Sequence, residues 1–206
     1  MPIHHSCFNN PFEVKHQKVD WKDSFPYSYE YGDKFFQEDA IAEINNIFIQ
    51  ANNIPDRLQH CSSLRIGELG FGFGLNFFVT AKIWLESEHS GDGKTLEYLS
   101  IEEALPNKVQ ILKVIKNFPE LKEVCNYFLE EYEPIHNDIQ KINLSRLNLR
   151  LTLIQNQAEP ALKNLIGFSN NKIDAWYLDG FDPKKNASMW NTRIFQYIGL
   201  LSNPNA

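Results

Sequence analysis

Three glycines at alternate positions, Gly70, Gly72 and Gly74, constrain the fold of this chain more than any other feature. An apolar segment, 64–69, precedes them, and apolar residues at helical spacing follow over 77–85. A strand, a glycine turn and a helix in this order form the first unit of an open α/β sheet. Glycine is needed where the backbone takes a positive φ or where a ligand lies against the main chain. The amides at the start of the following helix face any group bound in the turn, so the sequence predicts a ligand site there.

The spacing of the glycines separates two kinds of cofactor. A dinucleotide fingerprint reads G-x-G-x-x-G, and Leu75 occupies the last glycine position of a frame that begins at Gly70. The chain instead has Glu68 two residues before the first glycine, which gives the pattern E-x-G-x-G-x-G. This pattern resembles motif I of class I S-adenosylmethionine-dependent methyltransferases. The alternative interpretation is a glycine-rich loop that binds no ligand.

The 206 residues are 43% apolar and 22% charged, as expected for one globular domain with a sizeable core. Within it we expect an N-terminal extension over 1–60 and an α/β core over 61–206. The net charge of −6 is uneven, because residues 1–140 carry 12 Lys and Arg against 22 Asp and Glu, whereas residues 141–206 carry 8 against 4. The acidic part argues against tight nonspecific binding to nucleic acid, and the basic C-terminal third either meets a polyanion or is simply solvated.

Cysteine and histidine usage indicates a reducing compartment and no metal site. Cys7, Cys61 and Cys125 lie far apart without a disulfide framework, and the six histidines lack the spacing of metal ligands. The N-terminus shows no signal-peptide pattern, and no window approaches 18 uninterrupted apolar residues. We therefore expect a cytoplasmic protein that binds no metal and does not span a membrane.

The extension before the glycine turn is expected to contain short strands, turns and one helix. Residues 1–36 are rich in aromatic and turn-forming residues, which favours short strands packed against the core. Apolar residues recur at helical spacing over 41–51, and Pro55 follows. We expect a helix that ends before this proline.

Beyond the glycine turn, strands and helices alternate, which predicts a mostly parallel, doubly wound sheet. The further strands are expected at 96–101, 147–153 and 173–178. The further helices are expected at 107–118, with Asn107 as its cap, and at 119–132, 158–167 and 187–201.

Ligands of such sheets bind at the carboxyl ends of the strands, where polar residues follow two of the expected strands. Glu102 ends the second strand and could accept hydrogen bonds from both ribose hydroxyls of an adenosine cofactor, although a surface acid is the alternative. Asn156, Gln157 and Ala158 follow the third strand, where an amide could meet the adenine amino group. A helix N-cap explains this segment equally well.

The loop after the last strand, 178–183, combines an acid, a glycine, an aromatic residue and a proline. It resembles the (Asp/Asn)-Pro-Pro-aromatic loop that amino-group methyltransferases place against the acceptor nitrogen. Asp179 could orient this nitrogen towards the methyl donor, and Phe181 could stack on a base or shield the cation. The alternative is a structural turn with a capping aspartate.

The two motif regions together resemble one family, the methyltransferase half of the bifunctional tRNA 5-methylaminomethyl-2-thiouridine biosynthesis protein. The resemblance rests on 67–77, 176–186 and the pair Met189-Trp190, and it covers about residues 19–206. It implies a class I methyltransferase fold and the use of S-adenosylmethionine to methylate the aminomethyl group on wobble uridine 34 of tRNA. It also implies a separate FAD-dependent oxidase as a partner, because these 206 residues contain no oxidase half.

The resemblance also implies which residues bind the cofactor and which act in catalysis. The cofactor set is Glu68, Gly70, Gly72, Gly74, Asn76, Glu102, Gln157, Ala158 and Asp179, and the catalytic pair is Asp179 and Phe181. The chain departs from the family pattern at three places. Segment 156–158 replaces Gly-Asp-Ala, Glu103 replaces a lysine, and Asn45 replaces an arginine.

Two other functions stay open. One is a methyltransferase for another small amine, which would not need the basic C-terminal third, and the other is a catalytically impaired remnant. Related chains continue past the last expected helix with further strands that this sequence lacks. Because strand 173–178 reads as paired on both sides, we expect an open sheet edge there and self-association through it.

Overall fold

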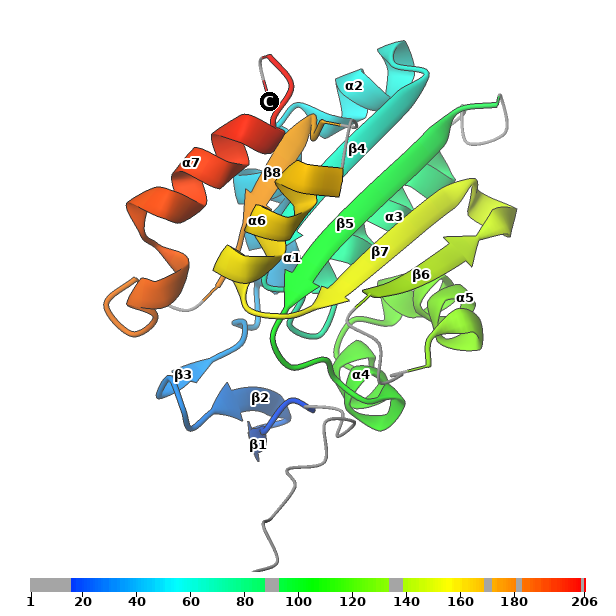
Figure 1. The fold of residues 1–206 in the computed structure, drawn as a ribbon. Coiled ribbons are helices and arrows are strands. Elements are labelled where there is room, and N and C mark those ends of the chain that lie inside the picture. Colours follow the sequence, from blue (N-terminus) through cyan, green and yellow to red (C-terminus); the bar gives the residue numbers. More distant parts are fainter. Residues whose placement is uncertain (1–15, 88–92, 134–138, 169–171, 181–182, 205) are drawn as a thin grey trace, which may run out of the picture.

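A computed structural model describes residues 16–87, 93–133, 139–168, 172–180, 183–204 and 206. They form a five-stranded sheet with helices on both of its faces and a smaller sheet of three strands beyond the strand ends (Figure 1). This is the layered α/β arrangement that alternating strands and helices predict.

The large sheet is doubly wound, as expected. Its parallel strands are β4 (Ser63–Leu69), β5 (Thr95–Glu102), β7 (Leu149–Gln155) and β8 (Ala175–Leu178), and β6 (Ile139–Leu144) is antiparallel. The strand order is β6-β7-β5-β4-β8, so the sheet grows from β4 in both directions. The topological switch point therefore lies beside β4, where such sheets bind their ligands.

Two groups of helices cover the two faces of this sheet (Figure 1). One group contains α3 (Leu75–Glu86), α4 (Lys108–Ile115) and α5 (Lys122–Glu131), and the other contains α6 (Ala158–Phe168) and α7 (Thr192–Leu201). The buried apolar residues divide in the same way. Phe77 and Trp84 of α3 belong to the larger cluster, and Leu162 of α6 and Ile194 of α7 belong to the smaller one.

The start of α4 confirms the expected cap at Asn107. Its side-chain oxygen accepts from the amide of Gln110, and the Gln110 side chain accepts from the amide of Asn107, both at 2.9 Å. This capping box satisfies two amides that the helix itself leaves unpaired. Pro119 likewise starts a short 3₁₀ turn, η2 (Pro119–Leu121), that leads directly into α5.

The single helix expected over 187–201 is two elements. A short turn, η4 (Ala187–Met189), precedes α7, and Asn191 separates them. The side-chain oxygen of Asn191 accepts from the amides of Arg193 and Ile194 at 2.9 and 3.1 Å. Because a capping residue has non-helical backbone angles, the helix restarts there.

The N-terminal strands β1 (Asp20–Lys22), β2 (Phe25–Ser28) and β3 (Asp33–Lys34) form a small antiparallel sheet. The ring of Phe73 in the glycine turn lies 4.9 Å from the ring of Phe35 and 6.2 Å from that of Trp21. Lys113 of α4 stacks over Trp21 at 3.8 Å. Aromatic and cation–π contacts therefore hold the N-terminal strands against the glycine turn.

The helix expected over 41–51 is present, but its winding changes. It begins as α1 (Ala40–Ile44) and continues as η1 (Asn45–Gln50), a wider π-helical segment. The side chain of Asn45 donates to the carbonyl of Ile41 at 2.9 Å. Such winding is frequent at functional sites, and Phe48 on this segment contributes to the cavity described below.

The helical segment α1–η1 ends at Gln50, before Pro55, as expected, but the chain then starts a second helix that was not expected. A further helix, α2 (Ile54–His60), starts after Asn53, and Pro55 lies in its first turn. Proline is tolerated there because the amide that it lacks would have no partner within the helix. Asn53 makes the change of direction in the left-handed conformation, with φ of 50°.

Strand β6 was not expected, and it makes the sheet mixed. It pairs antiparallel with β7, and the register runs from Ile139 opposite Ile154 to Leu144 opposite Leu149. The strand expected over 147–153 begins at Leu149, because Leu147 belongs to a 3₁₀ turn, η3 (Ser145–Leu147). The turn ends at Asn148 with φ of 47°, which reverses the chain between the two strands.

Strand β8 is the opposite edge and is shorter than the expected 173–178. Among the described residues, β8 pairs with β4 alone. Ile173, just before it, pairs with the chain that follows α7: its amide donates to the carbonyl of Leu201 at 2.8 Å, and its carbonyl accepts from the amide of Asn203 at 2.7 Å. This part of the edge is thus covered, and self-association through β8 stays a prediction.

Candidate functional site

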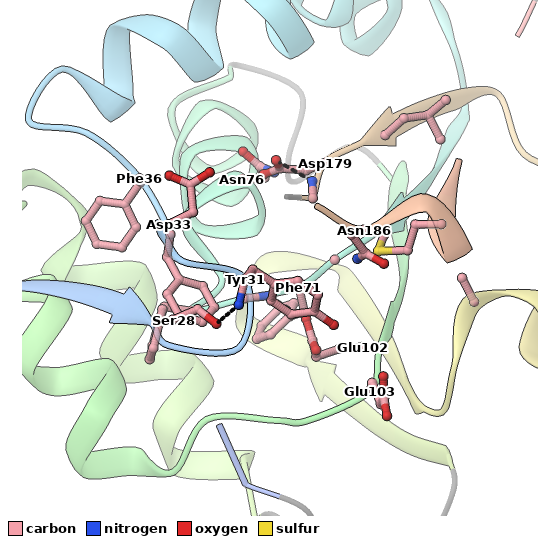
Figure 2. A pocket seen from close by; sticks show the side chains of 18 of the residues that line it. Ser28, Tyr31, Asp33, Phe36, Phe71, Asn76, Glu102, Glu103, Asp179 and Asn186 are labelled. Atoms are coloured by element: carbon pink, nitrogen blue, oxygen red, sulfur yellow. Dashed lines mark hydrogen bonds between the residues drawn. The ribbon is translucent and has the colours of Figure 1, made fainter. Parts of the chain in front are cut away.

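A cavity of about 640 Å³ lies at the carboxyl ends of the parallel strands. Its walls come from the glycine turn, the ends of β5, β7 and β8, the N-terminal strands, and the α1–η1 helix. Figure 2 shows side chains from segments far apart in the sequence converging on it. This hollow therefore lies where ligands of doubly wound sheets bind.

The glycine turn lies against the loop that follows β8. Gly70, Gly72 and Gly74 have φ of 90°, 53° and 82°. A Cβ atom on Gly70 would come 2.6 Å from the main-chain oxygen of Asp179. Only glycine allows this approach, so the residue brings the expected cofactor turn and the expected acceptor loop together. Gly70 and Gly72 line the cavity, whereas Gly74 packs against aromatic rings at the start of α3.

Glu102 lies in the cavity wall at the end of β5, as expected. Its two carboxylate oxygens accept from the amides of Gly72 and Ala104, each at 3.0 Å. Burial raises the pKa of Glu102, and these two amide hydrogen bonds oppose that shift. The carboxylate thus stands beside the glycine turn, and its contact with ribose hydroxyls stays a prediction.

Glu68 lies behind the cavity and is fully buried. One of its oxygens accepts from the side-chain amide of Asn76 at 3.0 Å, and the other accepts from the hydroxyl of Ser100 at 2.6 Å. Burial raises the pKa of Glu68 to about 8. Glu68 is not among the residues that line the cavity, so the structure offers it no direct contact with a ligand there.

Asp179 lies at the opposite wall, directly after β8. One oxygen accepts from the side-chain amide of Asn76 and the other from the amide of Gly180, both at 2.8 Å (Figure 2). Burial raises the pKa of Asp179, and these two hydrogen bonds oppose the shift. The expected catalytic partner Phe181 lies outside the described residues.

Gln157 and Ala158 also line the cavity, at the start of α6. The side-chain oxygen of Asn156 accepts from the amide of Gln157 at 2.8 Å, and the amide of Asn156 donates to the carbonyl of Glu102 at 3.0 Å. This main-chain bond joins the ends of β5 and β7. The segment therefore leads into α6 and faces the cavity, and its contact with adenine stays a prediction.

The N-terminal residues supply a wall that the sequence did not predict. Ser28, Tyr31, Asp33 and Phe36 face the cavity from the β2–β3 region (Figure 2). Lys185, from the loop after β8, forms an ion pair with Asp33 at 2.9 Å and donates to the carbonyl of Gly32 at 3.3 Å. The density of aromatic residues in 1–36 was the available signal, but it does not show which side chains face the core and which face a ligand.

The charged residues of the cavity lining are predominantly acidic. Its carboxylates are Glu30, Asp33, Glu43, Glu102, Glu103, Glu159 and Asp179, and its basic residues are Lys18, Lys34 and His16. A lining of this sign favours a positively charged ligand. In the part of the chain that the structure describes, no group of three or more His, Cys, Asp or Glu residues could hold a metal ion.

The comparisons with known proteins agree with this geometry. A sequence profile of the family described as S-adenosyl-L-methionine-dependent methyltransferase matches residues 119–206. The tRNA 5-methylaminomethyl-2-thiouridine biosynthesis bifunctional protein MnmC of Aeromonas hydrophila is 32% identical over 198 residues, which is 94% of this chain. Its counterpart in Pseudomonas entomophila is 33% identical over 196 residues, or 93% of this chain. The chain belongs to this methyltransferase family.

The methyltransferase spans 30% and 29% of the length of these two relatives. Its fold is also that of a solved structure, MnmC2 from Aquifex aeolicus, with a TM-score of 0.65 and 21% sequence identity. That match covers 93% of this chain and 58% of the other. No helix among the described residues is long and apolar enough to cross a membrane.

The cofactor of this family, S-adenosyl-L-methionine, fits the donor set of the cavity. It carries a sulfonium and an ammonium group, which suit an acidic lining, and an adenosine whose hydroxyls suit the carboxylate of Glu102. A Cβ atom on Gly72 would meet nothing closer than a ring atom of Phe35 at 3.9 Å, so this part of the turn leaves room for a ligand. The observed residues therefore match the cofactor that the family uses.

Proposed function

We propose that this methyltransferase transfers a methyl group to the aminomethyl group of 5-aminomethyl-2-thiouridine at wobble position 34 of tRNA. The name of the relatives supplies the substrate class. The observation that carries the proposal is the hydrogen bond between Asn76 and Asp179, at 2.8 Å, which joins the first turn of α3, directly after the glycine turn, to the acceptor loop. A cofactor and an amine in one cavity would therefore meet at Asp179.

The cofactor side of the proposal uses the residues around the glycine turn. Gly70 and Gly72 would lie against the ligand with their main chain, and Glu102 would accept from the ribose hydroxyls. Gln157 and Ala158, at the start of α6, would face the adenine. Bound S-adenosylmethionine supplies an electrophilic methyl group whose transfer discharges a sulfonium.

On the acceptor side, the protein has to orient the amine and needs no covalent nucleophile of its own. Asp179 accepts hydrogen bonds from Asn76 and Gly180, and these bonds fix the orientation of its carboxylate at the cavity. A carboxylate in this place would accept an N–H of the neutral amine and align its lone pair with the methyl group. It would also take up the proton that the nitrogen releases after transfer. Burial of Asp179 raises its pKa and so strengthens it as a proton acceptor.

The N-terminal wall would hold the nucleobase. Tyr31 and Phe36 present aromatic faces to the cavity, and such faces stack on bases at a gain of about 1–3 kcal/mol per base. Phe181 is proposed to stack in the same way or to shield the cation. We propose the cytoplasm as the location of this reaction on tRNA. We also propose an FAD-dependent oxidase as a partner activity, and the relatives are named bifunctional proteins.

The test is methyl transfer from radiolabelled S-adenosylmethionine to tRNA from cells that lack the terminal methylation. We expect label at wobble uridine and none in tRNA that already carries the methyl group. Methylation of a free small amine with tRNA left unlabelled would favour the alternative acceptor. Binding of S-adenosylhomocysteine without transfer to either acceptor would identify an impaired remnant.

A further inference from the structure

The side-chain nitrogen of Asn76 donates to two carboxylates at once. It lies 3.0 Å from an oxygen of Glu68 and 2.8 Å from an oxygen of Asp179. A side-chain amide has two N–H groups, so both are used. Asn76 is 4% exposed, and its oxygen has no hydrogen-bond partner among the described residues. Leaving a buried acceptor unpaired costs about 1–3 kcal/mol, so the two carboxylates dictate the orientation of this side chain.

The reverse orientation is excluded on electrostatic grounds. It would place the amide oxygen of Asn76 against carboxylate oxygens of both Glu68 and Asp179, all of them acceptors. Glu68 therefore fixes the orientation in which the side-chain amide of Asn76 donates to Asp179. Glu68 lies on β4 and Asp179 lies directly after β8, and Asn76 on α3 is the physical link between them.

The surroundings of Glu68 show that its effect on the cavity must be indirect. Ser100 donates to the oxygen that Asn76 does not contact. Tyr98 and Tyr177 are the titratable neighbours from β5 and β8, and Asp179 is the charged one. Burial raises the pKa of Glu68 to about 8. Below that pKa the proton of Glu68 would lie on the oxygen that faces Ser100, because the other oxygen accepts from Asn76, and the hydroxyl of Ser100 would then accept this hydrogen bond.

We propose that Glu68 and Asn76 are positioning residues for Asp179, and that this chain of hydrogen bonds transmits the charge of Glu68 to the acceptor-side carboxylate. The inference rests on the proposed function, in which Asp179 meets the acceptor amine. It assigns to Glu68 and Asn76 a role other than direct contact with the cofactor. The groups that face Asp179 are Asn76, the amide of Gly180 and the carboxylate of Glu43.

The first test needs no methyl acceptor. In the full chain labelled with ¹³C at aspartate carboxyls, the signal of Asp179 is assigned by its loss in Asp179→Asn and followed from pH 3 to pH 10. We expect its own titration and a second, smaller step near pH 8, where Glu68 ionises. Glu68→Gln keeps an acceptor for Asn76 and cannot ionise, so it should remove the second step alone.

Asn76→Ala should remove the second step and raise the pKa of Asp179, because the carboxylate loses a hydrogen bond that lowers it. Thr80→Val is the matched control. Thr80 lies one turn further along α3, is equally buried and donates to the main-chain oxygen of Asn76 at 2.7 Å. It should disturb the same helix and leave both steps unchanged. A second step that persists in Asn76→Ala and Glu68→Gln would overturn the proposal.

The second test separates positioning from cofactor binding. Asn76→Ala should lower kcat by about tenfold to a hundredfold, as expected for a displaced reacting group, while the Kd of S-adenosylhomocysteine changes by less than about threefold. In an Asp179→Asn background, Asn76→Ala should lower kcat almost no further, because both substitutions act at one carboxylate. If the Kd rises in proportion to the loss of rate, Asn76 is a cofactor ligand and the proposal fails. If the unmodified chain labels no tRNA, the proposed function fails, and the titration still decides the coupling.

Discussion

The ring of Phe73 packs edge to face against the ring of Phe35, with centroids 4.9 Å apart and planes at 76°. Phe73 belongs to the glycine turn and Phe35 to the N-terminal extension. The turn that would hold the cofactor is therefore supported from outside by a segment that precedes the whole α/β core. The stability of the cofactor site should depend on this contact.

Phe35→Leu tests that dependence. An aromatic pair contributes about 0.5–1.5 kcal/mol beyond the area that it buries, so we expect a small loss of stability. The Kd of S-adenosylhomocysteine should rise several-fold, because the turn loses its outer support. Isothermal titration calorimetry measures the affinity. Phe195→Leu, a substitution of a half-exposed ring on α7, is the control and should leave the affinity unchanged.

Gly70→Ala tests the close approach of the turn to the acceptor loop. The new Cβ atom would lie 2.6 Å from the main-chain oxygen of Asp179, so the loop must move. We expect cofactor binding and methyl transfer to fall together. Gly93→Ala is the matched control, because Gly93 also has a positive φ, of 74°, but has nothing within 4 Å of the added atom. The control should cost only the backbone strain, about 1–2 kcal/mol, and retain binding. Equal losses of binding in the two variants would contradict this interpretation.

Glu68→Gln should change how stability depends on pH. The pKa of Glu68 is about 8 in the folded chain, against an ordinary 4.5. Between these values the folded state binds more protons than the unfolded state, so the free energy of unfolding falls as the pH rises. The glutamine variant should lose much of that slope. At pH 9 its free energy of unfolding should exceed that of the parent by on the order of a few kcal/mol. Urea unfolding at pH 5, 7 and 9 measures this, and Glu86→Gln on the exposed end of α3 should keep the parent slope.

Glu102→Gln tests the acid at the end of β5. The carboxylate accepts from two main-chain amides, and a glutamine side chain has only one oxygen to offer. We expect weaker binding of S-adenosylhomocysteine, by about tenfold or more, from the loss of a charge-assisted bond and of the support for Gly72. An unchanged affinity would show that Glu102 is a structural acid.

Self-association through β8 is tested by sedimentation velocity over a range of concentrations. An unpaired edge strand is expected to pair with another chain, so the average mass should rise with concentration. Leu200→Lys places a charge on an exposed apolar position of α7 and should leave the association intact. If this change abolishes the association, the contact runs through α7 and the edge of β8 is not its cause.

Local signals in the sequence determined most of the elements. The alternate glycines, the cap at Asn107 and the apolar strands each act through neighbours a few residues away, so they can be read from the chain directly. The expected cofactor turn, the strand-end acid Glu102 and the loop at Asp179 consequently lie on one cavity. Pro55 correctly marked the end of the helix before it, but it did not reveal that α2 begins there, because proline occurs both after helices and in their first turn.

Tertiary structure alone decided the rest, because it depends on contacts between residues far apart in the chain. Strand β6 exists through its pairing with β7, and the wall at Tyr31 exists because Phe73 anchors the N-terminal strands. The sequence assigned Glu68 to a motif, but its burial behind the cavity follows from the way β4 and β5 pair. The bond from Asn76 to Asp179 spans 103 positions of the sequence, and no periodicity or spacing encodes such a contact.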